Sequence, residues 1–380
     1  APGPSDAPPV GGGSPGVSNG GGGTVGGGSP AAPVATGELL LADGTRIVVP
    51  VAGEVALPPG ASGEATLIMP GRVPSTIDLP AGGPTPALHP RTDVVPALPS
   101  GSARVVGSVF PPGDPDVAVQ FISGTRGPQP GTTTVIGGAY AMSVALDGTE
   151  AGLLVAREAT EYPRLGLARL TLTAGANPNV PNLGLVDPDP TPVAPPAAPA
   201  GYDITAARLL VAEGSGADVH RVQVVSVPGA RLPSYDLPGF TFVAAFLASA
   251  ADGNSATETS GSVGALPPFM LPPDLGALAR PTPGTRLSWG AAPGASLYTV
   301  RVGRDLSPDP PLWEAATQGL GATVPAGLAL AGQDLLVQVD AWDAPEVNVY
   351  SVASVRRLRL PAEPPGPRGR HSVALKRFTP

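Results

Sequence analysis

Short runs of aliphatic and β-branched residues, each ended by Gly, Pro or Asp-Gly, recur along most of the chain. The first group lies within residues 37–80, where Asp43-Gly44 separates two apolar runs. Asp-Gly between alternating hydrophobic runs is a strong hairpin signal. The pattern therefore predicts a small four-stranded unit, with strands at 38–42, 45–51, 64–69 and 75–79. A unit of about 45 residues builds only a small core, so we expect it to lean on a neighbour.

A second group of apolar runs fills residues 102–186 and predicts strands at 103–110, 117–122, 138–144, 152–156, 170–172 and 183–185. Gly138-Ala139-Tyr140 opens one of these strands, and the turn Asp147-Gly148 follows it. Gly152–Ala156 is aliphatic and precedes Tyr162. This order resembles the carboxypeptidase regulatory-like, or transthyretin-like, β-sandwich. The resemblance implies a noncatalytic module of envelope and secreted proteins.

A third group lies within residues 201–268, with apolar runs at 204–212, 220–227 and 240–248. Periodicity alone leaves the last run open to a buried helix or a strand. The following Ala251-Asp252-Gly253-Asn254-Ser255 favours a hairpin instead. An aliphatic strand, then Asp-Gly-Asn-Ser and a polar strand, resembles the last two strands of a fibronectin type III domain.

Residues 281–360 carry a fuller version of that resemblance. Leu287-Ser288-Trp289, Pro293-Gly294-Ala295 and Tyr298–Val302 resemble the second strand, the following loop and the third strand of fibronectin type III, and Leu335–Ala341 fits a later strand. The chain is thus similar to tandem fibronectin type III-like domains preceded by the carboxypeptidase regulatory-like module. We predict an all-β fold of several small antiparallel sandwiches.

Between these groups the sequence changes character. Residues 1–36 are rich in Gly and Pro and repeat VGGGSP at Val10–Pro15 and Val25–Pro30. Such a segment buries too little apolar surface to offset its ordering entropy, so we expect a flexible tether that becomes ordered only against a partner. Residues 81–101 and 187–200 are Pro-rich, which predicts stiff linkers.

Composition and charge exclude several classes of function and partner. Of 380 residues, 52 are Gly and 52 are Pro, a density that disfavours one long α/β enzyme. The net charge of −8 makes nucleic acid an unfavourable partner. The absence of Cys excludes disulfides, thiol catalysis and Cys-ligated metals. The longest apolar run, Phe240–Ala251, is shorter than the about 20 residues of a membrane-spanning helix, so no transmembrane segment is predicted.

The sequence contains no set of residues that is typical of a catalytic site. The strings Gly12–Gly16 and Gly16–Gly20 match G-x-S-x-G, but they lie in a glycine tract without the strand and helix that the motif needs. His89, His220 and His371 lie in three different segments, so a shared metal site is not favoured. We therefore predict no enzyme activity, no catalytic residue, no cofactor and no metal ligand.

Two further motifs have a chemical and a structural interpretation. Asp252, Asn254 and Glu258 offer oxygen ligands for calcium, but a tight hairpin explains Asp-Gly-Asn better. Tryptophans can form a sugar-binding face, yet the positions of Trp289, Trp313 and Trp342 in the predicted strands favour core packing. Calcium and polysaccharide are thus the less favoured ligands.

The C-terminus is the strongest candidate for binding a partner. Residues 351–380 carry seven basic side chains against one acidic residue, Glu363. Residues 361–380 are expected to form a basic tail in which His371–Phe378 is a β-like run. This run would add a strand to the sheet edge of a partner, or of this chain's own modules in the same or a neighbouring copy. A solvated tail is the alternative. The candidate partner-binding residues are Arg356, Arg357, Arg359, Arg368, Arg370, Val373, Leu375, Lys376, Arg377 and Phe378.

These features together predict a noncatalytic structural component of a cell envelope or surface, which binds other proteins, copies of itself among them. The alternative is a secreted polysaccharide-binding or enzyme-accessory protein. We expect an extracytoplasmic location, because Ala1 followed by Gly, Pro and Ser is typical of a mature N-terminus after removal of a signal peptide. A lipid anchor would require a residue upstream of Ala1.

Overall fold

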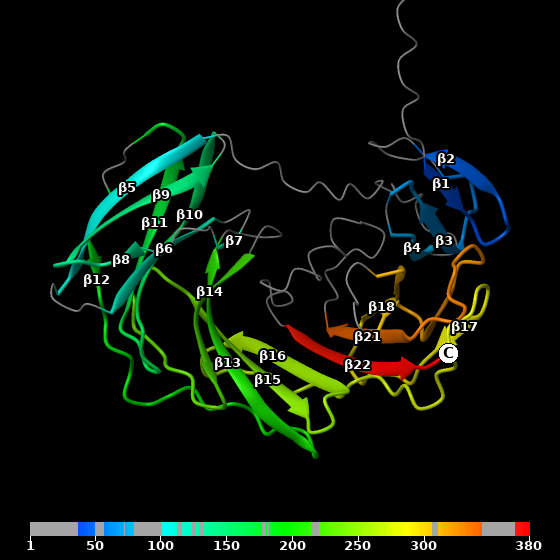
Figure 1. Ribbon diagram of the computed structural model, residues 1–380. Coiled ribbons are helices and arrows are strands. Elements are labelled where there is room, and N and C mark those ends of the chain that lie inside the picture. The colour runs from blue at the N-terminus through cyan, green and yellow to red at the C-terminus, as the bar shows by residue number, and fades with distance from the viewer. Residues whose placement is uncertain are drawn as a thin grey trace, which may run out of the picture. The chain divides into compact units, whose positions relative to one another are not determined.

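The computed structural model describes residues 37–49, 57–71, 73–79, 101–111, 116–123, 127–128, 133–146, 148–176, 180, 182–213, 220–305, 311–343 and 369–380. Every element assigned to these residues is a strand, and the strands form several sheets packed as sandwiches (Figure 1). The predicted all-β fold class is confirmed. The expected tether at 1–36 lies outside the described residues, as does the Pro-rich segment 80–100.

Residues 37–79 form the small four-stranded unit that the sequence predicts. Its antiparallel strands follow the order β2-β1-β3-β4. In the Asp43-Gly44 turn, Gly44 has a φ of 86° and the Thr45 N–H donates to Asp43 Oδ1 at 2.8 Å. A small apolar core fills the unit. The strands are β1 (Gly37–Leu40), β2 (Arg46–Val49), β3 (Gly63–Ile68) and β4 (Ser75–Leu79).

The next module is a sandwich of two sheets. One sheet has the order β12-β5-β9 and the other β11-β10-β6-β7, with β8 also paired to β6. A core of aliphatic and aromatic side chains lies between them. The strands are β5 (Gly101–Phe110), β6 (Val117–Ser123), β7 (Gly127–Pro128), β8 (Thr133–Thr134), β9 (Ala139–Leu146), β10 (Thr149–Glu158), β11 (Leu165–Thr173) and β12 (Leu183–Gly184).

A glycine and a tyrosine face one another across β5 and β9. Gly107 is the register partner of Tyr140, and a Cβ added at position 107 would collide with the tyrosine ring. The ring thus fills the space that a side chain would otherwise occupy. The Tyr140 hydroxyl is buried without a hydrogen-bond partner, and burial raises its pKa to about 12.

We predict that Tyr140 makes the folded chain less stable at alkaline pH. Unfolded tyrosine ionises near pH 10, so between about pH 10 and 12 the unfolded chain releases a proton that folded Tyr140 retains. The stability present below about pH 10 is therefore lost as the pH rises. The Tyr140→Phe variant lacks this titration. The difference between its melting temperature and that of the wild type should therefore shift in favour of the variant as the pH rises from about 9 to about 12. A constant difference across this range would contradict the assignment.

The middle strand β10 is covered on both faces. Its run Leu153–Ala156 is apolar without alternation, a pattern typical of strands buried on two sides. Leu154 and Ala156 belong to the core inside the sandwich, whereas Leu153 and Val155 belong to a second core with β13, β14 and β15. The modules at 102–186 and 201–268 therefore share a core.

The third module confirms the predicted hairpin over the alternative of a helix. β15 and β16 are antiparallel neighbours, and Gly253 in their turn has a φ of 68°. The Asn254 N–H donates to Asp252 Oδ1 at 2.9 Å, which closes the turn. The segment 187–200, predicted as a linker, contacts this module, because the Val193 N–H donates to the Leu232 carbonyl at 2.8 Å. The strands are β13 (Tyr202–Glu213), β14 (His220–Pro228), β15 (Phe242–Ala250) and β16 (Ser255–Ser262).

The last module packs a two-stranded sheet, β17-β20, against the strands β22, β21, β18 and β19. All three tryptophans are buried as predicted: Trp313 is fully buried, and Trp289 and Trp342 are each 5% exposed. Strand β22 pairs with β21, so the C-terminal run docks on a module of its own chain, one of the alternatives that the sequence left open. The strands are β17 (Arg286–Ser288), β18 (Leu297–Arg304), β19 (Trp313–Thr317), β20 (Gly321–Thr323), β21 (Leu335–Asp343) and β22 (Arg370–Phe378).

One twelve-stranded sheet connects three of these modules. Its order is β14-β13-β15-β16-β22-β21-β18-β19-β4-β3-β1-β2. Two junctions in this order join strands that are distant in sequence: β22 lies between β16 and β21, and β4 pairs with β19. The sequence predicted separate sandwiches and did not indicate this shared sheet.

Candidate functional site: two strand-docking seams

The first seam is formed by β22, which is hydrogen-bonded on both sides within its own chain. Its register with β21 runs from Leu335 opposite Phe378 to Asp343 opposite Arg370. On its other side, residues 370–374 pair with residues 255–259, the first part of β16. Figure 1 shows β16, β22 and β21 side by side. The C-terminal run thus completes a sheet edge of this chain, which was one of the alternatives that the sequence left open.

Six of the ten predicted partner-binding residues lie in β22. They are Arg370, Val373, Leu375, Lys376, Arg377 and Phe378. The other four, Arg356, Arg357, Arg359 and Arg368, lie outside the described residues. The β-like character of His371–Phe378 is confirmed, whereas its binding to another protein remains a prediction.

The basic side chains of β22 are paired within the chain. Arg370 Nη2 lies 2.7 Å from Asp343 Oδ2, and Arg377 Nε donates to Asp305 Oδ1 at 2.9 Å. Arg377 also donates to the side-chain oxygen of Asn254 at 2.9 Å, which connects β22 to the β15–β16 turn. Two of the basic side chains that the sequence assigned to partner binding, Arg370 and Arg377, are therefore paired with carboxylates of this chain.

Lys376 is held by backbone oxygens instead of a carboxylate. Its Nζ donates to the carbonyls of Leu275, Gly276 and Leu278, each at 2.9 Å. The three protons of an ammonium group suit three acceptors. The side chain thus fixes the 275–278 segment against β22.

Neighbouring substitutions in β22 should differ in their effects. Lys376→Met leaves three carbonyls without this donor and should lower the free energy of unfolding by about 1–3 kcal/mol. Arg377→Met removes an ion pair whose arginine is 54% exposed and should cost less than about 1 kcal/mol. Urea unfolding of both full-length variants tests this. Equal losses would contradict the prediction, because the carbonyl contacts of Lys376 would then contribute no more than the exposed ion pair of Arg377.

A polar cluster fixes the register of β22 on β21. The His371 ring stacks on Trp342 with centroids 3.8 Å apart, and its Nε2 lies 3.0 Å from Asp340 Oδ1. Trp342 Nε1 donates to Thr299 Oγ1 at 3.1 Å, and Thr299 donates to Asp340 Oδ2 at 3.4 Å. Asp340 is buried, so a shift of β22 by one residue would leave a buried carboxylate without this partner.

The second seam joins the small N-terminal unit to the last module. Strand β4 pairs with β19 in parallel, with Ser75 opposite Glu314 and Ile77 opposite Ala316. Ser75 Oγ donates to Glu314 Oε1 at 2.8 Å, and Glu314 is buried. The unit leans on a neighbour, as its small size led us to expect.

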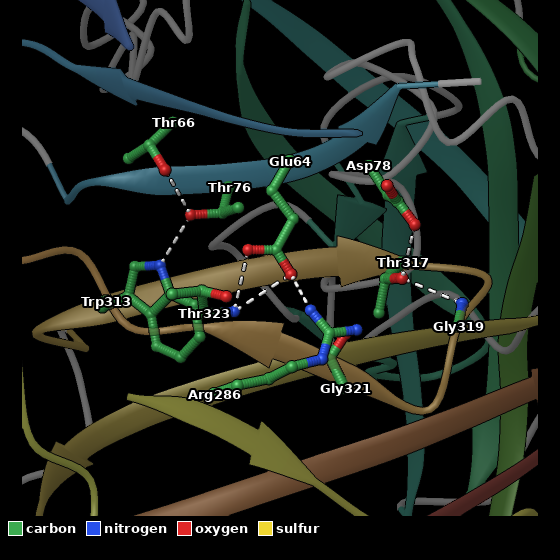
Figure 2. A network of polar contacts seen from close by, with 10 residues as sticks. All are labelled: Glu64, Thr66, Thr76, Asp78, Arg286, Trp313, Thr317, Gly319, Gly321 and Thr323. Atoms are coloured by element: carbon green, nitrogen blue, oxygen red, sulfur yellow. Dashed lines mark hydrogen bonds and ion pairs between the residues drawn. The ribbon is translucent and has the colours of Figure 1, made fainter. Parts of the chain in front are cut away.

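Buried hydroxyls and an indole form the centre of this seam (Figure 2). Trp313 Nε1 donates to Thr76 Oγ1 at 2.9 Å, and the Thr76 hydroxyl is 2.9 Å from that of Thr66. On one side of these groups, Thr317 donates to Asp78 Oδ2 at 3.3 Å. All of these hydroxyls are buried, and each finds its partner across the seam or in the neighbouring strand.

An acidic residue of β3 extends the seam to the second sheet of the last module. Glu64 Oε1 accepts a hydrogen bond from Arg286 Nη1 at 2.6 Å, and both of its carboxylate oxygens lie 3.1 Å from the Thr323 backbone nitrogen. Arg286 also donates to the carbonyl of Gly321 at 3.2 Å. Figure 2 shows the Glu64 carboxylate pointing toward the Arg286 guanidinium and the Thr323 backbone nitrogen. One carboxylate therefore holds β17 and β20 against the N-terminal unit.

Sequence reasoning missed this second seam. The sequence feature that could have indicated it is a set of polar residues: Thr66, Thr76 and Asp78 lie in strands of a unit that is too small to bury them without a neighbour. The partners of Thr76 and Asp78 across the seam are more than two hundred residues away, and no local pattern identifies such a pairing.

The remaining predictions on chemistry concern histidines, metals and membranes. His89 and the side chain of His220 lie outside what the structure describes, and His371 belongs to the cluster on β21. Within the described ranges, no group of three or more His, Cys, Asp or Glu side chains could hold a metal ion. The same residues contain no helix that is long and apolar enough to cross a membrane.

Comparisons with known proteins add little to this description. No protein-family model and no curated protein matches the chain. Among solved structures, the FN1–FN3 domains of chicken CNTN1 match it with 10% sequence identity, over 76% of this chain and 92% of that chain, at a TM-score of 0.16. At that TM-score the match adds nothing to what the strands themselves show.

Proposed function

We propose that the chain is a noncatalytic structural component of a cell envelope or surface, and that it binds other proteins by adding strands at the edges of its β modules. One observation carries the proposal: the chain itself unites its modules in this way at both β22 and β4. Main-chain pairing at a sheet edge is also a general mode of recognition between proteins. The resemblance of 102–186 to carboxypeptidase regulatory-like modules supports the extracytoplasmic location.

The edge strand β2 is the surface we assign to a partner. Among the described residues, β2 pairs on one side only, with β1. Val48 on β2 is 69% exposed, and Ile68 on β3 is 40% exposed. Both are register partners of Glu38 on β1, so they lie in one row across the sheet. An exposed edge with apolar side chains favours pairing with an extended segment of another chain.

Site-specific photo-crosslinking tests this function. A benzophenone amino acid at Val48 of the full-length chain, expressed in its native cells, should yield covalent adducts with envelope proteins. The control position is Asp252, which is exposed in a turn and not on an edge strand. Equal yields of protein adducts at both positions, or none at Val48, would contradict the proposal. Retention on insoluble polysaccharide without protein adducts would favour an accessory role instead.

A further inference from the structure

The β4–β19 seam joins two bodies that keep separate apolar cores. The core of the N-terminal unit contains Leu39, Leu67 and Ile77, and shares no member with the core of the last module, which contains Trp313. The contacts that cross the seam include a short parallel ladder, hydrogen bonds between side chains, the Thr323 N–H bonds to Glu64 and the Glu64–Arg286 ion pair. Opening the seam therefore breaks these contacts and uncovers the indole nitrogen of Trp313, but it divides no core that the two bodies share.

An opened seam leaves two complementary surfaces on one molecule. On one side are the edge of β4, Thr76 and Asp78; on the other are the edge of β19, Trp313 and Thr317. On opening, water replaces the lost partners, and each hydrogen bond that forms again contributes about 0.5–1.5 kcal/mol, so both surfaces favour re-pairing. The β4 surface of one molecule matches the β19 surface of any other.

We propose that a second copy of this chain binds at the β4–β19 seam, so that the N-terminal unit of one molecule docks β4 on β19 of its neighbour. The inference rests on the proposed function, in that strand addition is the binding mode, and it names the partner. The interface is heterologous, because a different surface is used on each copy. Reciprocal exchange would close a dimer, and sequential exchange would build a filament.

The length of the connection permits the exchange. Twenty-one residues, 80–100, separate β4 from β5. Fully extended, they span at most about 70 Å. The contacts are the same within one molecule and between two, so concentration decides between them. A short linker gives an effective concentration in the millimolar range. Exchange should therefore be substantial near 1 mM chain and about a hundredfold rarer near 10 μM.

Cysteine trapping provides the test, because the chain has no cysteine of its own. Full-length Asp78→Cys and Thr317→Cys variants place thiols where the two native side chains lie 3.3 Å apart. The two proteins are unfolded together in urea, refolded at about 1 mM or about 10 μM, and oxidised. Mass spectrometry should find the interchain 78–317 disulfide in excess of the 78–78 and 317–317 disulfides at the higher concentration.

Matched controls make the result decisive. Asp252→Cys mixed with Asp78→Cys reports random collision at an exposed turn. The double variant, refolded at the lower concentration, should close the same disulfide within one chain. A mixture of the unsubstituted protein with its ¹⁵N-labelled form should give mixed dimers by native mass spectrometry.

A 78–317 disulfide between chains no more frequent than the controls at about 1 mM, with no mixed dimer, would overturn the inference. Failure of the double variant to close would overturn it too, since the seam itself would then be absent. The first result leaves the proposed function untouched, because that function is tested at Val48 against other proteins. The second would remove the β4 seam from its support and leave the β22 seam. Conversely, if strand exchange between copies is observed but Val48 gives no adducts with envelope proteins, the proposed function would be wrong and this inference would still hold.

Discussion

Removing residues 370–380 should abolish the cooperative unfolding of the last module. Strand β22 pairs with both β16 and β21, and Ala374 and Phe378 pack on the core of that module. Its loss leaves backbone groups unpaired on two strands, and each buried one costs about 1–3 kcal/mol. A few such groups equal the whole stability of a typical domain, about 5–15 kcal/mol. Calorimetry of the truncated chain should show loss of one transition.

The control for this truncation removes only Thr379-Pro380, which lie beyond the strand. That variant loses the exposed hydrogen bond from Arg280 to the Thr379 carbonyl and should retain every transition of the full-length chain. If the chain without 370–380 retained every transition of the full-length protein, β22 would be dispensable and would have to be regarded as a tail.

Replacing Trp313 should cause the largest loss from a single substitution. Its side chain is fully buried in the core of the last module, and its indole also bonds Thr76 across the seam. Trp→Ala in a core typically costs about 3–5 kcal/mol. Urea unfolding of Trp313→Ala should show a loss in this range. A loss below about 1 kcal/mol would contradict the burial of this residue.

A double-mutant cycle separates the two roles of Trp313. Trp313→Phe retains an aromatic ring without the indole N–H, and Thr76→Val removes the acceptor. If the hydrogen bond between them stabilises the seam, their effects should be non-additive by about 0.5–1.5 kcal/mol. Additive losses would assign the effect of Trp313 to packing alone.

Local signals predicted most of the strands. Asp43-Gly44 and Asp252-Gly253 were identified as hairpin turns because these residues suit tight turns and glycine accepts a positive φ. The alternation in Ala139–Leu146 reflects a strand with one buried face. The continuous apolar run Leu153–Ala156 carried a further signal, burial on both faces, which we did not use.

These local signals could not predict which strands pair when the strands are distant in sequence. The basic C-terminal run was predicted to bind a partner or this chain's own modules, and the carboxylates that Arg370 and Arg377 contact are Asp343 and Asp305 of the same chain. Whether an edge recruits a strand from the same chain or from a partner depends on geometry and effective concentration, which composition does not encode. For the same reason the β4–β19 seam had no signature beyond polar residues in a small unit.

Backbone hydrogen exchange over residues 370–378 tests the central claim most directly, because that claim is that the C-terminal run is an internal strand of the sheet. In the native full-length protein the amides of residues 370–374 should exchange as slowly as those of β21, since this part of β22 pairs with β16 on one side and β21 on the other. The alternate amides of 375–378 that bond to β21 should be protected as well. Exchange at the rate of an unstructured peptide, while β21 stays protected, would contradict it.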